Sequence, residues 1–217
     1  MKDYQFRPSS VGKLMTEPKT KSEGPLSAGA KTYIRELAAQ YIFGVDFEIE
    51  SKYLDKGIIC EQQSIDLLND VRGLYLVKNA ERRTNEYLNG ECDLFDSSRN
   101  IGHDIKTSWS LQTFPILERD CHDKLYEWQM RAYMMLWDAN EWEINYCMIN
   151  TPEDLIKFEP LELHVVDHIP KEHRVTTWVI QREKEKEEMM KEKIIFAREY
   201  MQQVFKEFDS THKALTF

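Results

Sequence analysis

The sequence lacks any run of 18 apolar residues, so no membrane-spanning helix is expected. Its opening, MKDYQFRPSS, lacks the apolar core of a secretory signal, and we expect a cytoplasmic protein. It has only four cysteines and no CxxC pair: Cys60, Cys92, Cys121 and Cys147. In a reducing compartment, such widely spaced cysteines are expected to be free thiols.

The sequence also lacks an excess of basic residues, because its net charge is −9. This charge excludes a protein that coats nucleic acid indiscriminately, but it leaves room for a local basic groove. It also suits a site that gathers carboxylates around a hard cation. No internal repeat is present, and 217 residues that are 41% hydrophobic predict one globular domain over 1–217.

The periodicity of apolar residues predicts helices around a sheet. We expect a loop over 16–25, a helix from the N-cap Ser27 to Gly44, and a second helix over about 48–69. The pattern predicts strands, with turns between them, at 74–79, 85–96, 100–108, 142–150, 161–167 and 173–180.

Three further helices complete the expected set, at about 11–15, 122–140 and 181–208. The residues expected to face inward on the second and last helices are apolar: Ile58, Ile65, Leu68, Met189, Ile194, Ala197, Met201 and Phe205. The order of elements indicates an α/β or α+β fold, with a central mixed sheet flanked by helices.

The stretch GHDIKTS, residues 102–108, places Asp104 and Lys106 on the same face of a predicted strand. The two side chains form either a simple ion pair or a catalytic carboxylate beside a catalytic lysine. Asp93 lies on the preceding strand, which can bring it close to Asp104. Two facing carboxylates repel each other unless a proton or cation lies between them, and Mg²⁺ prefers such oxygen ligands.

Two helical motifs flank these strands. Gly57 and Glu61 form a GxxxE pattern before them, and Gln129 and Tyr133 form a QxxxY pattern after them. Residues at i and i+4 share one helix face, so Gln129 and Tyr133 are expected to point together toward one cleft. The simpler alternatives are a solvent-facing Glu61 and a core Tyr133 with Gln129 at its edge.

Ser9 and Ser10 open the short helix near the N-terminus, with Arg7 next to them. A helix N-terminus with such neighbours is a ready site for an anion. The alternative is that Ser9 is only an N-cap.

The pattern Asp93-x(10)-Asp104-x-Lys106 resembles the active site of the PD-(D/E)xK nuclease superfamily. The GxxxE and QxxxY patterns are similar to motifs of its RecB-like and lambda-exonuclease-like branch. The segment FRPSSVGKLMTEP resembles the N-terminal segment of phage exonucleases and YqaJ-like viral recombinases. The resemblance implies a restriction-endonuclease-like core.

The resemblance also implies a role for each residue. Mg²⁺, with Mn²⁺ as a substitute, would be held by Asp93, Asp104 and the Ile105 carbonyl, with support from Glu61. Lys106 would orient or activate the attacking water. Gln129 and Tyr133 would position the substrate. Ser9, Ser10 and Arg7 would bind a DNA phosphate.

We therefore expect a Mg²⁺-dependent exonuclease that hydrolyses phosphodiester bonds of linear duplex DNA. The resemblance implies 5′-to-3′ degradation in phage-type recombination or genome processing, in a bacterial or phage-infected host cytoplasm. It also implies a ring-shaped trimer and a single-strand annealing partner. The alternatives are a structure-specific or restriction-type endonuclease and a non-catalytic DNA-binding protein on the same scaffold.

Some residues near the motifs are assigned no chemistry. Some RecB-like nucleases hold an iron–sulfur cluster with one early cysteine and three late ones, and this sequence has no such set, so we expect no cluster. Alternation should point His103 away from Asp104, as a packing or surface residue. Trp109 and Trp128 either stack on unpaired bases or pack in the core, and we favour the core.

Overall fold

The computed structural model describes residues 3–47 and 51–213 of the chain. Its helices are α1 (Pro8–Leu14), α2 (Ala28–Phe43), α3 (Lys52–Ile59), α4 (Glu61–Arg72), α5 (Lys124–Trp137), α6 (Glu153–Ile156) and α7 (Lys184–Lys213). Its strands are β1 (Arg82–Thr84), β2 (Asn89–Glu91), β3 (Leu94–Asp96), β4 (Ile101–Thr107), β5 (Glu141–Cys147) and β6 (Val175–Gln181).

The central sheet has four strands in the order β3-β4-β5-β6. β4 is antiparallel to β3 and parallel to β5, and β6 is antiparallel to β5, so the sheet is mixed as predicted. The parallel pair is connected through α5, because parallel neighbours need a crossover. The β3–β4 register pairs Leu94 with His103, which brings Asp93 beside Asp104.

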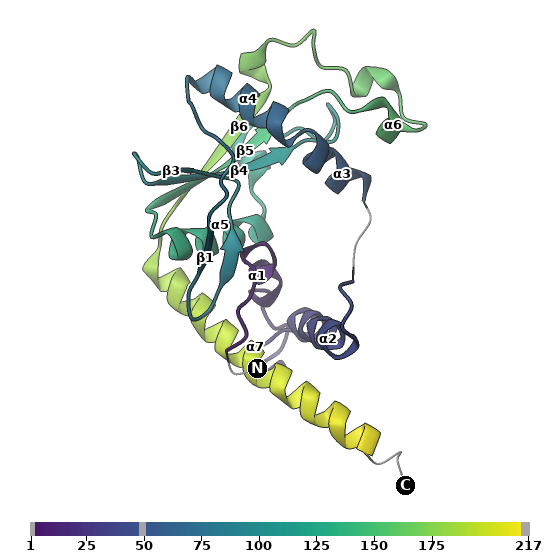
Figure 1. Ribbon diagram of the computed structural model, residues 1–217, viewed down its shortest axis with the longest axis vertical. Helices are drawn as coiled ribbons and strands as arrows, with labels where there is room; N and C mark the ends of the chain where they lie inside the picture. The colour runs from purple at the N-terminus through teal and green to yellow at the C-terminus, as the bar shows by residue number, and fades with distance from the viewer. Residues whose placement is uncertain (1–2, 48–50, 214–217) are drawn as a thin grey trace.

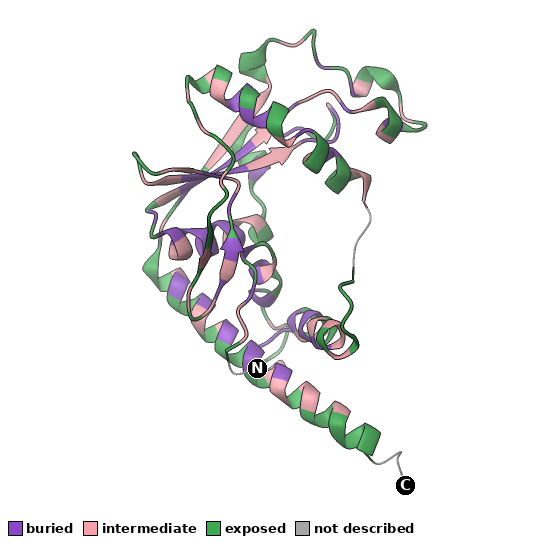
Figure 2. Cartoon of the chain, viewed as in Figure 1, coloured by how far each residue is buried: buried purple, intermediate pink, exposed green. Residues whose placement is uncertain are grey.

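Helices cover the sheet on both sides, as Figure 1 shows. α3 and α4 pack on one side, α5 packs on the other, and α1 and α7 pack against α5. α2 contacts α7, the long helix that runs along the far side of α5 and extends past the body of the protein. Buried residues follow the sheet and the inner faces of α5 and α7 (Figure 2). This arrangement confirms the predicted fold class.

Local sequence signals define α2 as expected. The Ser27 hydroxyl accepts a hydrogen bond from the Ala30 N–H at 3.0 Å, which caps the first turn. Gly44 ends the helix with a φ of 65°, a left-handed conformation that glycine adopts without strain. The predicted start and end of this helix are both confirmed.

The predicted helix over 48–69 is wrong as a single element. It is divided at Cys60 into α3 and α4, and residues 48–50 lie outside the described part of the chain. Ile65 and Leu68 are buried as predicted, but Ile58 is 66% exposed. The break changes the direction of the helical face, so the apolar stripe of α4 does not continue into α3.

Three other elements differ from their predictions. The segment 161–167 is a 3-10 turn at Leu161–Leu163 followed by loop, because it follows Pro160 and lies outside the sheet. The segment 74–79 forms only an isolated bridge at Lys78, and 85–96 is divided into β2 and β3. The sequence pattern did not predict β1. On α7, Met189 is 41% exposed and its neighbour Met190 is buried.

Gly102 on β4 lies directly against the buried ring of Trp142 on β5. A Cβ added at Gly102 would lie 2.3 Å from that ring. Trp142 in turn stacks on Tyr133 of α5, with ring centroids 5.2 Å apart. The glycine therefore lets the aromatic layer pack flat against the strand that carries Asp104 and Lys106.

The four cysteines are all buried and unpaired, as predicted. In residues 3–47 and 51–213, no helix has both the length and the apolar character to cross a membrane.

Candidate active site

A cleft of about 700 Å³ opens beside the C-terminal half of β4. Its walls come from α3, the start of α4, the segment between β2 and β3, β4 itself and α5. The predicted site residues that line it are Glu61, Asp93, Asp104, Ile105, Lys106 and Gln129. The structure therefore brings together residues that are up to 68 positions apart in the sequence.

Asp93 and Asp104 form a buried carboxylate pair in this cleft. Asp104 is 1% exposed, and Asp93 is partly buried and accepts the Ile105 N–H at 2.8 Å. Burial, and then the negative charge of Asp104, raise the pKa of Asp93 to about 7. The positive charge of Lys106 and the Ile105 hydrogen bond lower the pKa of Asp93 by less. A cation bound between Asp93 and Asp104 would therefore relieve the repulsion between their two carboxylates.

Lys106 lies beside the pair. Its Nζ is 2.7 Å from Asp104 Oδ2 and 4.4 Å from the centre of the Tyr126 ring. Burial lowers the pKa of Lys106, but the charges of Asp104 and Asp93 outweigh it, and the net effect raises the pKa. Lys106 is therefore a cation at neutral pH, within reach of both carboxylates.

The donor set fits Mg²⁺. Apart from the ion pair with Lys106, the buried Oδ2 of Asp104 has no hydrogen-bond partner among the described residues. Within the same part of the chain, no three His, Cys, Asp or Glu side chains lie together as a complete metal shell. Mg²⁺ needs no such shell, because it binds through one or two carboxylates and keeps several waters. Asp93 and Asp104, with the Ile105 carbonyl, suit this mode.

Glu61 lies at the wall of the cleft as the first residue of α4. Its carboxylate forms an ion pair with Lys78, which is 56% exposed. Lys78 also lines the cleft and was not singled out from the sequence. The structure places Glu61 near the carboxylate pair, but its direct charge partner is this lysine.

Gln129 and Tyr133 lie one turn apart on α5. Gln129 Nε2 donates to Asp104 Oδ1 at 3.4 Å, a long hydrogen bond inside the cleft. The Tyr133 hydroxyl instead donates to the Glu91 carbonyl at 2.9 Å, and Tyr133 lines a second cleft rather than the first. The two side chains share a helix face as predicted, but they face different clefts.

The second cleft has a volume of about 260 Å³ and contains Arg7, Ser9 and Arg82 beside Tyr133. Ser10 lies in a neighbouring third cleft of about 520 Å³, which Arg7 and Ser9 also line. The Ser10 hydroxyl donates to the Arg7 carbonyl at 3.1 Å. Arg7, Ser9 and Ser10 therefore line clefts other than the carboxylate cleft.

Two residues without assigned chemistry lie where we expected. His103 is fully buried, with Nδ1 3.0 Å from a Glu143 carboxylate oxygen, so it is a packing residue. Trp109 is 6% exposed and donates its Nε1–H to Glu159 at 2.9 Å, which confirms a core position.

Lys56 was missed by the sequence interpretation. It is buried beside the cleft, directly before the Gly57 of the GxxxE pattern. A lysine among the residues of a helix gives no signal of burial by itself, because lysine is usually exposed.

The chain is 35% identical to a phage-related exonuclease from Haemophilus somnus 129PT, with a TM-score of 0.88 over 95% of this chain and 97% of that one. This chain belongs to the phage-related exonuclease family. The result confirms the resemblance to the lambda-exonuclease-like branch of the PD-(D/E)xK nucleases.

An alkaline exonuclease from Laribacter hongkongensis has the same fold as this chain, at 13% sequence identity. The TM-score is 0.71, over 98% of this chain and 95% of that one. The structure of the same enzyme in complex with dAMP gives 14% identity and a TM-score of 0.66, over 99% and 96%. A scan of protein-family profiles and a search of curated proteins found no match.

Proposed function

We propose that the chain is a Mg²⁺-dependent exonuclease that hydrolyses phosphodiester bonds of linear duplex DNA. The observation that carries the proposal is the convergence of Asp93, Asp104 and Lys106 in one cleft of a phage-related exonuclease fold. A scaffold that only bound DNA would have no chemical need for two carboxylates that repel each other in a buried position.

Each residue has a chemical task in this proposal. Asp93, Asp104 and the Ile105 carbonyl hold Mg²⁺, which when bound neutralises charge on the scissile phosphate and makes water a stronger acid. Lys106, held by Asp104, orients the attacking water and stabilises the negative charge that develops on the phosphate. Gln129 donates to Asp104 and fixes the direction of its carboxylate.

The second cleft supplies a place for backbone phosphates. Arg7 and Arg82 lie in it beside the Ser9 hydroxyl. Arg82 forms an ion pair with Glu91, which lines the same cleft, so the excess positive charge of this cleft comes from Arg7. Tyr133 lines this cleft one helical turn from Gln129 in the first cleft. A DNA strand that passes from the second cleft to the first would therefore meet phosphate-binding groups and then the carboxylates.

Several finer properties belong to the same proposal. Similarity to a phage-related exonuclease supports a role in phage-type recombination or genome processing in the cytoplasm of a bacterium or infected host. We propose 5′-to-3′ degradation, a trimeric ring that surrounds the DNA, and cooperation with a single-strand annealing protein. Mn²⁺ would also support the reaction when it is supplied in place of Mg²⁺.

The experiment uses linear duplex DNA labelled at one end or the other, with a covalently closed circle in a parallel reaction. In Mg²⁺, the protein should shorten the linear duplex from its 5′ ends and leave the circle intact, and EDTA should stop the reaction. Loss of label from the 3′ ends first would show that the protein degrades DNA in the 3′-to-5′ direction instead. Cleavage of the circle would establish an endonuclease instead.

A matched pair of variants tests the second cleft. Arg7→Ala should raise the KM for DNA and reduce the dependence of binding on salt, with little change in kcat, because one phosphate contact is lost. The control is Lys19→Ala, because Lys19 is exposed and lines none of the three clefts described. This variant should leave the KM and the salt dependence of binding unchanged.

A further inference from the structure

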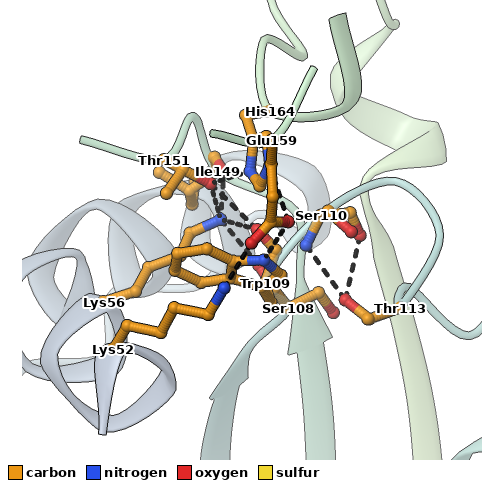
Figure 3. A network of polar contacts seen from close by, with 10 residues as sticks. All are labelled: Lys52, Lys56, Ser108, Trp109, Ser110, Thr113, Ile149, Thr151, Glu159 and His164. Atoms are coloured by element: carbon orange, nitrogen blue, oxygen red, sulfur yellow. Dashed lines mark hydrogen bonds and ion pairs between the residues drawn. The ribbon is translucent and has the colours of Figure 1, made fainter. Parts of the chain in front are cut away.

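Lys56 is a buried lysine that is held entirely by uncharged oxygens. It points from α3 into the turns that follow β4 and β5, and it is 1% exposed (Figure 3). Its Nζ donates to the carbonyls of Ser108 at 2.7 Å, Ile149 at 2.8 Å and Trp109 at 3.0 Å, and to the Thr151 hydroxyl at 2.8 Å. An ammonium group has three protons, so all of them have acceptors.

A second set of contacts surrounds these bonds. Glu159 accepts hydrogen bonds from Trp109 Nε1 at 2.9 Å and from Lys52, which lies one turn before Lys56 on α3. His164 lies between Glu159, at 3.2 Å, and the Thr151 hydroxyl, at 2.9 Å. The network thus connects α3 to two segments that come from distant parts of the sequence (Figure 3).

These bonds have a geometric consequence for the candidate active site. α3 supplies the Gly57 wall of the cleft and leads directly into Glu61 at the start of α4. The carbonyls of Ser108 and Trp109 follow the end of β4, the strand of Asp104 and Lys106. Lys56 is therefore a direct connection between the two walls of the cleft.

The connection depends on a charged amine, since a neutral side chain could not satisfy three buried carbonyls. Burial lowers the pKa of Lys56 to about 8, while the nearby Cys60 thiol raises it slightly. Among residues 3–47 and 51–213, no carboxylate forms an ion pair with Lys56, which distinguishes it from an ordinary buried ion pair.

We propose that Lys56 is a positioning residue, which fixes the wall that carries Glu61 at the correct separation from Asp93 and Asp104. It thereby sets the affinity of the site for a divalent cation. This inference rests on the proposed nuclease function and deepens it, because it assigns control of the metal site to a residue that touches neither metal nor DNA.

The test compares Lys56→Met with Arg198→Met. Arg198 is also a buried cation that donates to main-chain carbonyls, those of Tyr4 and Glu86, but it lies on α7 and does not line the cleft. Both variants should be less stable to urea. Mn²⁺ binding, followed by electron paramagnetic resonance, should be at least tenfold weaker in Lys56→Met and within twofold of the wild type in Arg198→Met.

Cleavage supplies the second measurement. At saturating Mn²⁺, the kcat of Lys56→Met should return to within about threefold of the wild type, because the catalytic groups themselves are intact. If Lys56→Met does not fold, Thr151→Val removes a hydroxyl that accepts from Lys56 and also donates to the Trp109 carbonyl at 2.9 Å. The variant therefore loosens the turn that Lys56 holds, and it should weaken Mn²⁺ binding about threefold.

The outcomes separate this inference from the proposed function. Wild-type affinity for Mn²⁺ in a folded Lys56→Met protein, or in Thr151→Val where Lys56→Met is unfolded, would overturn the positioning role alone. Equal weakening in Arg198→Met would also overturn it. A wild-type protein that binds no Mn²⁺ and cuts no DNA would overturn the nuclease function, and this inference with it.

Discussion

The buried carboxylate pair should make the metal-free protein less stable than a variant that lacks one of the charges. The change is Asp93→Asn, which keeps an oxygen that can accept the Ile105 N–H but removes the charge that faces Asp104. We expect the variant to be more stable than the wild type at pH 8, and to have lost its affinity for Mg²⁺.

The magnitude follows from the pKa of Asp93, which is raised from an ordinary 3.8 to about 7. A carboxyl group whose pKa is raised by folding contributes full stability below its unfolded pKa and loses that contribution as the pH rises through its folded pKa. Between pH 5 and pH 8 the wild type should lose about 2.7 kcal/mol in this way, because about two pH units separate pH 5 from the folded pKa, at roughly 1.4 kcal/mol per unit. Asn has no such dependence, so the stability gap should widen by that amount.

The assay is urea unfolding of both proteins at pH 5 and pH 8, in EDTA and in saturating Mg²⁺. Mg²⁺ should stabilise the wild type alone, since the ion occupies the place where the charges repel. Asp96→Asn is the control, because a hydrogen bond from Ser98 lowers the pKa of Asp96 and keeps it charged at both pH values. If the stability difference between the wild type and Asp93→Asn stays constant or narrows toward pH 8, the charge of Asp93 does not destabilise the metal-free protein.

Four further substitutions test other parts of the structure. Gly102→Ala should destabilise the protein by about 2 kcal/mol or more in urea unfolding, because its methyl group would overlap the Trp142 ring; equal stability would contradict this packing. Glu143→Gln should cost about 3 kcal/mol in the free energy of unfolding at pH 7, since the pKa of Glu143 is lowered from 4.5 to about 2. In an acid titration, this loss of stability should shrink as the pH falls from 4.5 toward 2. Lys78→Met should strengthen Mn²⁺ binding a few-fold by freeing Glu61 from its ion pair, whereas Glu61→Gln should weaken it, and the opposite order in a binding titration would exclude Glu61 from the metal site.

The parts of the site that lie on regular strands and helices were predictable from the sequence. A period of two placed Asp104 and Lys106 on one face, and a short turn between antiparallel strands placed Asp93 next to them. The helical period also placed Gln129 and Tyr133 on one face. These are local rules, and they hold because β4 and α5 formed as predicted. Asp93 is an exception, because it lies in the bend between β2 and β3 and not on a strand as expected.

Contacts made by the tertiary fold were not predictable in the same way. The ion pair of Glu61 with Lys78 joins a helix to an irregular segment, and nothing in the spacing of 17 residues indicates it. The burial of Lys56 depends on turns that follow two strands more than 50 residues away. The separation of Tyr133 from the first cleft depends on the packing of its ring against Trp142.

The most direct test of the central claim is cleavage of end-labelled linear duplex DNA by the wild type and by Asp104→Asn in the same Mg²⁺ buffer. We expect the variant to fold and to bind the duplex as the wild type does. Its cleavage rate should fall by about a thousandfold or more, since metal binding and the position of Lys106 both depend on this carboxylate. Unchanged cleavage by Asp104→Asn would contradict the assignment of the active site.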